Sequence, residues 1–223
     1  MLRHSVLFTF RDEAGPAQRL LMMKGLAYLR FECPSVRALD FGADLFGGSG
    51  QTPVGSPNRK SNGGSVGYDV ALHLDFADRA DFREYSANPI HRAVSAYNAS
   101  VCREKLTARV DWNPEEGVTH SVGHLRHTVM FVWNANIDDA GRKSAFSQVE
   151  QLMRAPETET MAIGIDAGEN NTNYDWMIDV QLFDLDSADH LINGETYGAA
   201  MSALAPLIQP ERTARQTHLM HGL

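Results

Sequence analysis

The feature that most constrains this chain is an internal duplication. Three short segments occur twice in the same order: Leu-Arg-His at 2–4 and 125–127, Tyr-Asp at 68–69 and 174–175, and Thr-Ala-Arg at 107–109 and 213–215. The second and third pairs are both separated by 106 positions, and independent landmarks rarely share one offset by chance. The chain is therefore interpreted as two copies of a unit of roughly 100 residues, an ordinary domain size. We predict a first domain at residues 1–113 and a second at 122–223.

Composition narrows the class of protein and of partner. The 43% hydrophobic content is enough for two small cores, and the net charge of −8 opposes binding to nucleic acid or to an anionic membrane surface. No apolar run reaches the roughly 18 residues that a membrane-spanning helix needs, and no signal-peptide pattern opens the chain. Cys33 and Cys102 lack CxxC spacing, so we expect ordinary buried thiols in a reduced, cytoplasmic protein.

Each copy shows the order strand, helix, strand, strand, helix, strand. Alternation over residues 4–10 places His4, Val6 and Phe8 on one face of a strand, and residues 127–133 repeat the pattern. Helix stops and breaks occur at matching places in both copies: Pro34 and Pro156, Asn88-Pro89 and Asn193-Gly194. This order predicts an α+β fold of two ferredoxin-like β-α-β-β-α-β repeats, each with both helices on one face of an antiparallel sheet.

The bare faces of the two sheets need cover, and two fused copies can cover each other. Packing sheet against sheet gives a dimeric α/β barrel within one chain, an intrachain pseudo-dimer. Polar residues of the first copy are then expected in or near the interface between the sheets: Ser5, Thr9, Asp69, His73 and Asp75. Some of them require hydrogen-bond partners there.

The copies differ in one loop. There are 25 residues between Gly42 and Tyr68, but only 9 between Gly164 and Tyr174. The surplus at 47–64 is rich in Gly, Ser, Pro and Asn. Such a segment is either a tolerated insertion or a lid over a nearby pocket.

The first copy resembles the stress-responsive dimeric α/β barrel domain family. The resemblance rests on the strand from His4 to Phe10, Tyr68-Asp69, the segment Tyr85-Ser-Ala-Asn-Pro-Ile-His91 and the closing strand Ala108 to Trp112. The second copy resembles the family more weakly, so nearly the whole chain is covered. The resemblance implies the barrel fold. One branch of the family is formed by plant polyketide cyclases related to olivetolic acid cyclase.

The resemblance to these cyclases implies catalytic roles for His91, Tyr85 and His4. It also implies that His4 and its strand face point toward the helices. There the expected substrate-binding residues would line an apolar cavity: Val6, Phe8, Val70, Leu72 and Leu74. An apolar pocket with a few convergent polar groups is the usual form of a small-molecule site.

Chemistry supports the same three residues independently. An aldol-type cyclase removes a proton beside a carbonyl, so it needs a base near neutral pH and a donor for the oxyanion. His91 can be the base and the Tyr85 hydroxyl the donor. The prediction is a cyclase or lyase acting on a small apolar or aromatic carbonyl compound. The alternative is a non-catalytic stress-responsive or ligand-binding barrel, in which these side chains only support the fold.

The second copy departs from the pattern at the same positions. The offset of 106 places Leu191 at the position of Tyr85 and Tyr197 at that of His91, while His127 is retained. Trp176 replaces Val70 and is expected to fill the cavity. The second copy is therefore either a structural partner or a different site that uses His127 and Tyr197.

No cofactor or metal is predicted. His120, His124 and His127, and His218 with His221, have spacings that metal sites can use. No carboxylate or thiolate of fitting spacing accompanies them, so we expect a solvated linker and tail instead. No phosphate-binding loop with its strand-to-helix setting occurs. Further association of the fused pair into a homo-oligomer stays open.

Overall fold

The computed structural model describes residues 1–46, 66–114, 122–170 and 172–221. The predicted loop at 47–64 lies outside these ranges. The first half of the molecule runs from β1 to β5: β1 (Leu2–Phe8), α1 (Pro16–Glu32), β2 (Ala38–Ala43), β3 (Val66–Gly67), β4 (Val70–Phe76), α2 (Arg79–Ala87), α3 (Pro89–Val101) and β5 (Ala108–Trp112). The second half runs from β6 to β9: β6 (Leu125–Phe131), α4 (Asp139–Glu150), β7 (Thr158–Ile165), β8 (Trp176–Leu182), α5 (Leu185–Asn193), α6 (Glu195–Leu204) and β9 (Ala214–Leu219).

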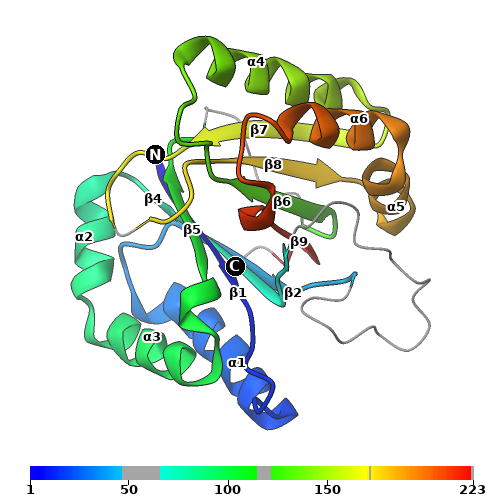
Figure 1. Cartoon of the computed structure of the whole chain (residues 1–223). Coiled ribbons are helices and arrows are strands. Elements are labelled where there is room, and N and C mark those ends of the chain that lie inside the picture. Colours follow the sequence, from blue (N-terminus) through cyan, green and yellow to red (C-terminus); the bar gives the residue numbers. More distant parts are fainter. Residues whose placement is uncertain (47–65, 115–121, 171, 222–223) are drawn as a thin grey trace.

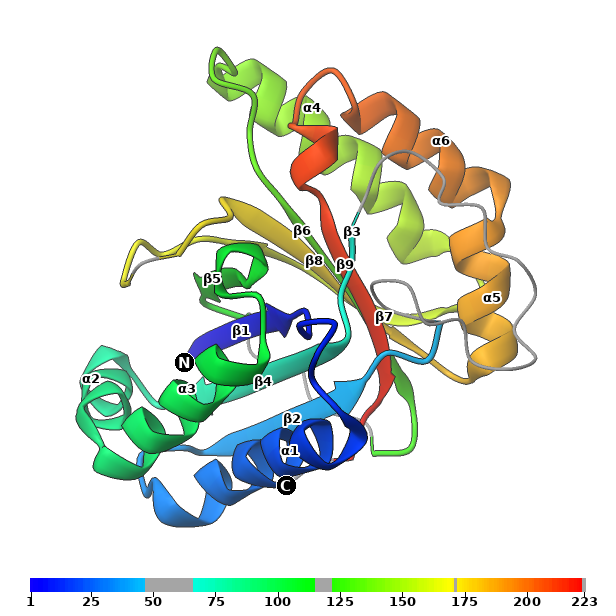
Figure 2. The same cartoon turned by 60° about the horizontal axis from the view of Figure 1, so that its bottom comes forward.

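The strands form two sheets that face each other (Figure 1). One has the order β2-β4-β1-β5, and the other has the order β3-β9-β6-β8-β7. All pairings are antiparallel except that of β3, which runs parallel to β9 and so adds two residues of the first half to the sheet of the second. The helices cover the outer faces, α1 to α3 on one side and α4 to α6 on the other (Figure 2). The predicted α+β fold, two ferredoxin-like halves paired within one chain, is confirmed.

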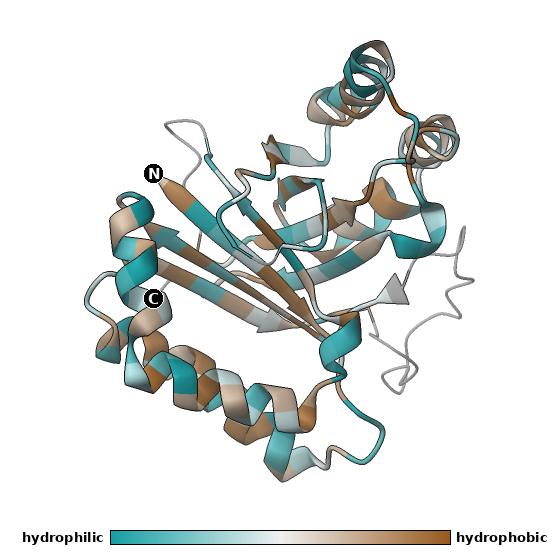
Figure 3. Ribbon diagram, turned by 60° about the vertical axis from the view of Figure 1, so that its left-hand side comes forward, coloured by the Kyte–Doolittle hydropathy of each residue, from teal (hydrophilic) through white to brown (hydrophobic). Residues whose placement is uncertain are grey.

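Alternation along the strands separates the helix-facing core from the core between the sheets (Figure 3). In β1, Val6 and Phe8 pack in the core under the helices, whereas Leu7 packs between the sheets. In β6, Val129 packs in the core under the helices and Met130 packs between the sheets. Because side chains alternate with a period of two, a slip of one residue would exchange the two faces, so both cores hold the register.

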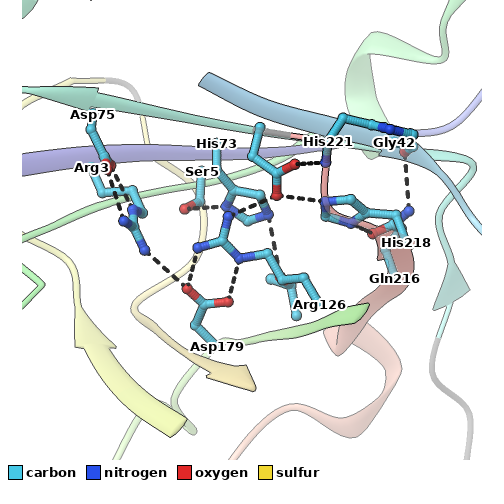
Figure 4. A network of polar contacts seen from close by, with 12 residues as sticks. Arg3, Ser5, Gly42, His73, Asp75, Arg126, Asp179, Gln216, His218 and His221 are labelled. Atoms are coloured by element: carbon cyan, nitrogen blue, oxygen red, sulfur yellow. Dashed lines mark hydrogen bonds and ion pairs between the residues drawn. The ribbon is translucent and has the colours of Figure 1, made fainter. Parts of the chain in front are cut away.

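A buried ion-pair network connects the two sheets (Figure 4). Arg3 donates to both carboxylate oxygens of Asp75, at 2.6 and 2.8 Å, and reaches Asp179 of the other sheet at 3.2 Å. Arg126 donates to both oxygens of Asp179, at 2.7 and 2.8 Å, and crosses to Asp40 at 3.0 Å. Both guanidinium groups are fully buried. Each half therefore neutralises charge of the other, and removing one partner would leave an uncompensated buried charge.

His218 extends this network at the edge where β2 meets β9. Its Nε2 lies 2.9 Å from Asp40 Oδ2, and its Nδ1 lies 2.8 Å from Gln216 Oε1. The Gln216 amide donates in turn to the carbonyl of Gly42 at 3.2 Å. Burial by itself would raise the pKa of Asp40, but the His218 hydrogen bond and the charges of His218 and Arg126 hold that pKa well below its usual range. Asp40 is thus a carboxylate inside the barrel.

Two equivalent seams join the sheets into a barrel. At one seam the Leu45 N–H donates to the Thr217 carbonyl at 2.8 Å, and at the other the Ala167 N–H donates to the Asp111 carbonyl at 2.6 Å. Each seam also contains a glycine under a large ring. A Cβ at Gly42 would lie 2.6 Å from Cβ of His218, and a Cβ at Gly164 would lie 2.6 Å from Cδ2 of Trp112.

We expect Gly42→Ala and Gly164→Ala each to destabilise the chain by about 1–3 kcal/mol, because the added methyl group overpacks a seam. Gly198→Ala is the matched control. Its Cβ meets nothing within 4 Å on helix α6, so the same change should stabilise by about 0.5–1 kcal/mol. Urea unfolding of the three variants measures the differences. Seam variants as stable as the natural chain would contradict the tight contact.

Candidate active site

A cavity of about 400 Å³ lies between the first sheet and helices α1, α2 and α3. Six of the residues predicted from the sequence line it: His4, Val6, Phe8, Leu72, Tyr85 and His91. Val70 and Leu74 are buried in the same core but do not belong to its lining. The fold thus brings the three predicted catalytic side chains from β1, α2 and α3 to one cavity.

The break between α2 and α3 places Tyr85 next to His91. Asn88 ends α2 and caps α3, since its side-chain oxygen accepts a hydrogen bond from the Ile90 N–H at 2.8 Å. Pro89 occupies the first position of α3, where a missing N–H removes no helical hydrogen bond. The rings of Tyr85 and His91 are 4.1 Å apart between centroids. The helix break seen in the sequence is therefore the device that builds this pair.

Burial sets the protonation of both rings. Burial and the nearby Cys33 raise the pKa of Tyr85, so its hydroxyl stays protonated and can donate a hydrogen bond. Burial lowers the pKa of His91 to about 4, and the neighbouring His4 adds to this shift. A hydrogen bond with the backbone of Ser86 opposes the shift without outweighing it. His91 is accordingly a neutral imidazole at physiological pH.

The third predicted residue, His4, has a carboxylate partner. His4 and Asp111 are opposite each other in the register of β1 and β5, and His4 Nδ1 lies 2.5 Å from Asp111 Oδ1. The Asp111 side chain is fully buried, and its other oxygen has no hydrogen-bond partner among the described residues. A carboxylate on one nitrogen orients the ring and fixes its tautomer, so that the other nitrogen is left as an acceptor. The pair therefore has the form of a histidine prepared to accept a proton.

Sequence analysis missed Asp111, although a signal was present. Arg109 and Asp111 are two residues apart in β5, so they lie on the same face of the strand. They are opposite Val6 and His4 of β1, respectively. A charged residue in an otherwise buried closing strand indicates a paired or functional group. Arg109 also lines the cavity and was likewise not predicted.

The second half contributes to the mouth of this cavity. The exposed Asn170, in the loop between β7 and β8, belongs to the lining. The neighbouring Glu169 forms an ion pair with Arg79 of α2 at 2.7 Å, which fastens this loop to the first half. The cavity is therefore complete only when both halves are present.

The equivalent histidine of the second half is fully engaged. His127 Nδ1 lies 2.8 Å from Thr217 Oγ1, and its Nε2 lies 3.0 Å from the Tyr197 hydroxyl. Thr217 stands where the first half has Asp111, and Tyr197 where it has His91. The ring has neither a carboxylate partner nor a histidine neighbour at these positions.

Large side chains fill the corresponding space of the second half. Trp176 is fully buried and stacks on Phe131 and Trp133, with ring centroids 4.2 and 4.8 Å apart. Leu45 and Phe46 pack against the same core from the first half. At the other seam the second half supplies the small side chain of Ala167, which packs against the core of the first half and is followed by a glycine. Substitutions at matched positions thus place larger side chains in the core of the second half than in that of the first.

The sequence and the fold identify the family. The sequence model described as the Stress responsive A/B Barrel Domain matches residues 2–114. The chain therefore belongs to this family. No curated protein matches the chain. Within the described ranges, none of the helices has the length and apolar character needed to cross a membrane.

The chain is also similar to several solved structures. A provisionally named monooxygenase from Fusobacterium nucleatum is 12% identical, with a TM-score of 0.56 over 98% of this chain and 91% of its own. A provisionally named chlorite dismutase is 10% identical, with a TM-score of 0.57 over 98% of this chain and 94% of its own. A dimeric ferredoxin-like protein of unknown function from Thermobifida fusca is 21% identical, with a TM-score of 0.40 over 47% of this chain and 98% of its own. At such identities the likeness concerns the fold alone.

We expect the His91 imidazole to titrate with a midpoint of about 4 in the folded protein, because burial disfavours its charged form. Two-dimensional NMR of the ¹⁵N-labelled chain as a function of pH measures this midpoint, and His91→Gln assigns the resonance. A midpoint near the ordinary histidine value of about 6.5 would show that the ring is solvated.

Proposed function

We propose that the chain is an enzyme of the cyclase or lyase type, acting on a small apolar or aromatic carbonyl compound. The observation that carries this proposal is the convergence of the His4–Asp111 pair, His91 and Tyr85 on one cavity of about 400 Å³. Apolar side chains such as Val6, Phe8 and Leu72 line part of the same wall, which suits the body of a small organic molecule. The resemblance to polyketide cyclases supports aldol-type ring closure as the reaction.

The first step is removal of a proton from the carbon beside a carbonyl. The electron pair moves onto the carbonyl oxygen and forms an enolate, which the Tyr85 hydroxyl stabilises by donating a hydrogen bond. The enolate carbon then attacks a second carbonyl carbon of the same molecule, and the new alkoxide takes a proton from the protonated base. A carbon–carbon bond forms, and the base returns to its starting state.

Two histidines can be the base. His91 is neutral and ready to accept a proton, but a pKa of about 4 makes it a weak base at neutral pH. His4 has a buried carboxylate on Nδ1, which orients the ring and leaves Nε2 as the proton acceptor. Because His91 is a weak base and His4 is held in place at the same cavity, we assign the base to the His4–Asp111 pair. His91 then adjoins Tyr85 and orients the reacting carbonyl.

Proton abstraction can be measured without knowing the natural substrate. The probe is 3-benzoylpropanamide in D₂O, whose CH₂ group beside the ketone exchanges hydrogen for deuterium when a base removes its proton. We expect the natural chain to accelerate this exchange above the buffer background. His4→Gln and Asp111→Asn should each lower the acceleration about 100-fold, the usual contribution of a general base. Proton NMR follows the loss of the CH₂ signal.

Matched variants separate the roles. Tyr85→Phe should lower the exchange rate about 10-fold through loss of the oxyanion donor. Tyr197→Phe removes a tyrosine hydroxyl from the second half, away from this cavity, and should change nothing. If His91→Gln abolishes exchange while His4→Gln does not, the base is His91. Absence of exchange above background would contradict the enzyme and favour the alternative, a barrel that binds its ligand unchanged.

A further inference from the structure

Arg109 is the cationic side chain of the cavity wall. It lies in β5 opposite Val6, is half-buried, and contributes to the lining. Within the described ranges, no hydrogen bond or ion pair joins its guanidinium to another residue. Its five N–H donors are therefore available to the contents of the cavity.

The described charged residues near Arg109 attract its guanidinium but form no ion pair with it. Glu104 and Asp111 attract it electrostatically, while burial acts against its charged form. Asp111 is already hydrogen-bonded to His4, and Glu104 is exposed at the mouth. A partly desolvated guanidinium without a bonded partner is costly unless it meets water or an anionic ligand. Because the carboxylates of Glu104 and Asp111 are nearby, a ligand with a single negative charge is repelled less than a ligand with two.

The positions of Arg109 and Asp111 in β5 set the distance between the guanidinium and the proposed base, His4. Arg109 and Asp111 are two residues apart on one face of β5, so their Cα atoms are separated by roughly 7 Å. His4 lies opposite Asp111. A molecule whose one end is bound by Arg109 can therefore place a carbon atom, a few bonds from that end, next to His4. Asn98 also lines the cavity, and its Oδ1 has no partner in the described part of the chain.

We propose that the cavity takes a carbonyl compound that carries a carboxylate, and that Arg109 binds this carboxylate. This substrate class rests on the proposed function, because the carbonyl is what the base acts upon. The carboxylate is held by charge-assisted hydrogen bonds at the guanidinium. The apolar body of the molecule lies against Val6, Phe8 and Leu72.

Isothermal titration calorimetry with two probes of equal size tests the proposal. The acid 3-benzoylpropanoate and the neutral 3-benzoylpropanamide differ in charge at one end. The natural full-length chain should bind the acid at least 10-fold more tightly than the amide. Arg109→Met should remove this preference by weakening the acid at least 10-fold, with the amide unchanged, and Arg109→Lys should retain part of it.

Arg215→Met is the matched control, since Arg215 occupies the equivalent position of the second half. It should bind both probes as the natural chain does. Unchanged amide affinity in Arg109→Met shows that the cavity is intact. Equal affinity of acid and amide for the natural chain, or binding of neither, overturns the proposal. Equal weakening of both probes by Arg109→Met, or loss of the preference in Arg215→Met, also overturns it.

The calorimetric test of the carboxylate site and the exchange test of the proposed function can fail independently of each other. Deuterium exchange in the neutral amide depends on His4 and Asp111, and Arg215→Met should leave it unchanged. Acid preference without exchange would remove the enzyme and keep the anion site. Exchange without acid preference would keep the enzyme and remove the carboxylate from its substrate.

Discussion

The structure depends on the buried ion pairs between the two sheets. Arg3 and Arg126 stand at the same place in the two halves, and Asp179 accepts hydrogen bonds from both of them. Such a cluster is expensive to desolvate and stabilises only when every charge has its partner. The two sheets are thereby held at one separation and in one register. Neither sheet could place these charges against a wholly apolar partner, so each half supplies the partners that the buried charges of the other require.

The pairing has a consequence for the site. The second half covers the first sheet, and at the positions equivalent to the candidate site it carries different side chains. Trp176 and Tyr197 stand where the first half has a valine and His91, and they fill space or bond to His127. At the same time, the loop after β7 supplies Asn170 to the cavity mouth of the first half. The second half is thus both scaffold and part of the wall.

The asymmetry follows from small differences at equivalent positions. Asp111 gives His4 a carboxylate, whereas Thr217 gives His127 a hydroxyl. A carboxylate changes the basicity of its histidine, and a hydroxyl only orients it. Leu45 and Phe46 pack against the core of the second half, whereas the smaller Ala167 packs against that of the first. The same backbone plan therefore carries different side chains around its two cores.

The duplicated segments and the alternating strands determined the fold by themselves, because sheet faces and helix breaks are local properties of the chain. The Tyr85 to His91 spacing across a helix break also identified residues that share the cavity. The sequence could not show that Arg3 and Arg126 bridge two sheets, since their partners Asp75, Asp179 and Asp40 are distant in the chain. Only the tertiary structure decided that Asp111 pairs with His4 and that, among the described residues, none forms an ion pair with the Arg109 guanidinium, because the register of β1 and β5 joins positions that are distant in the chain.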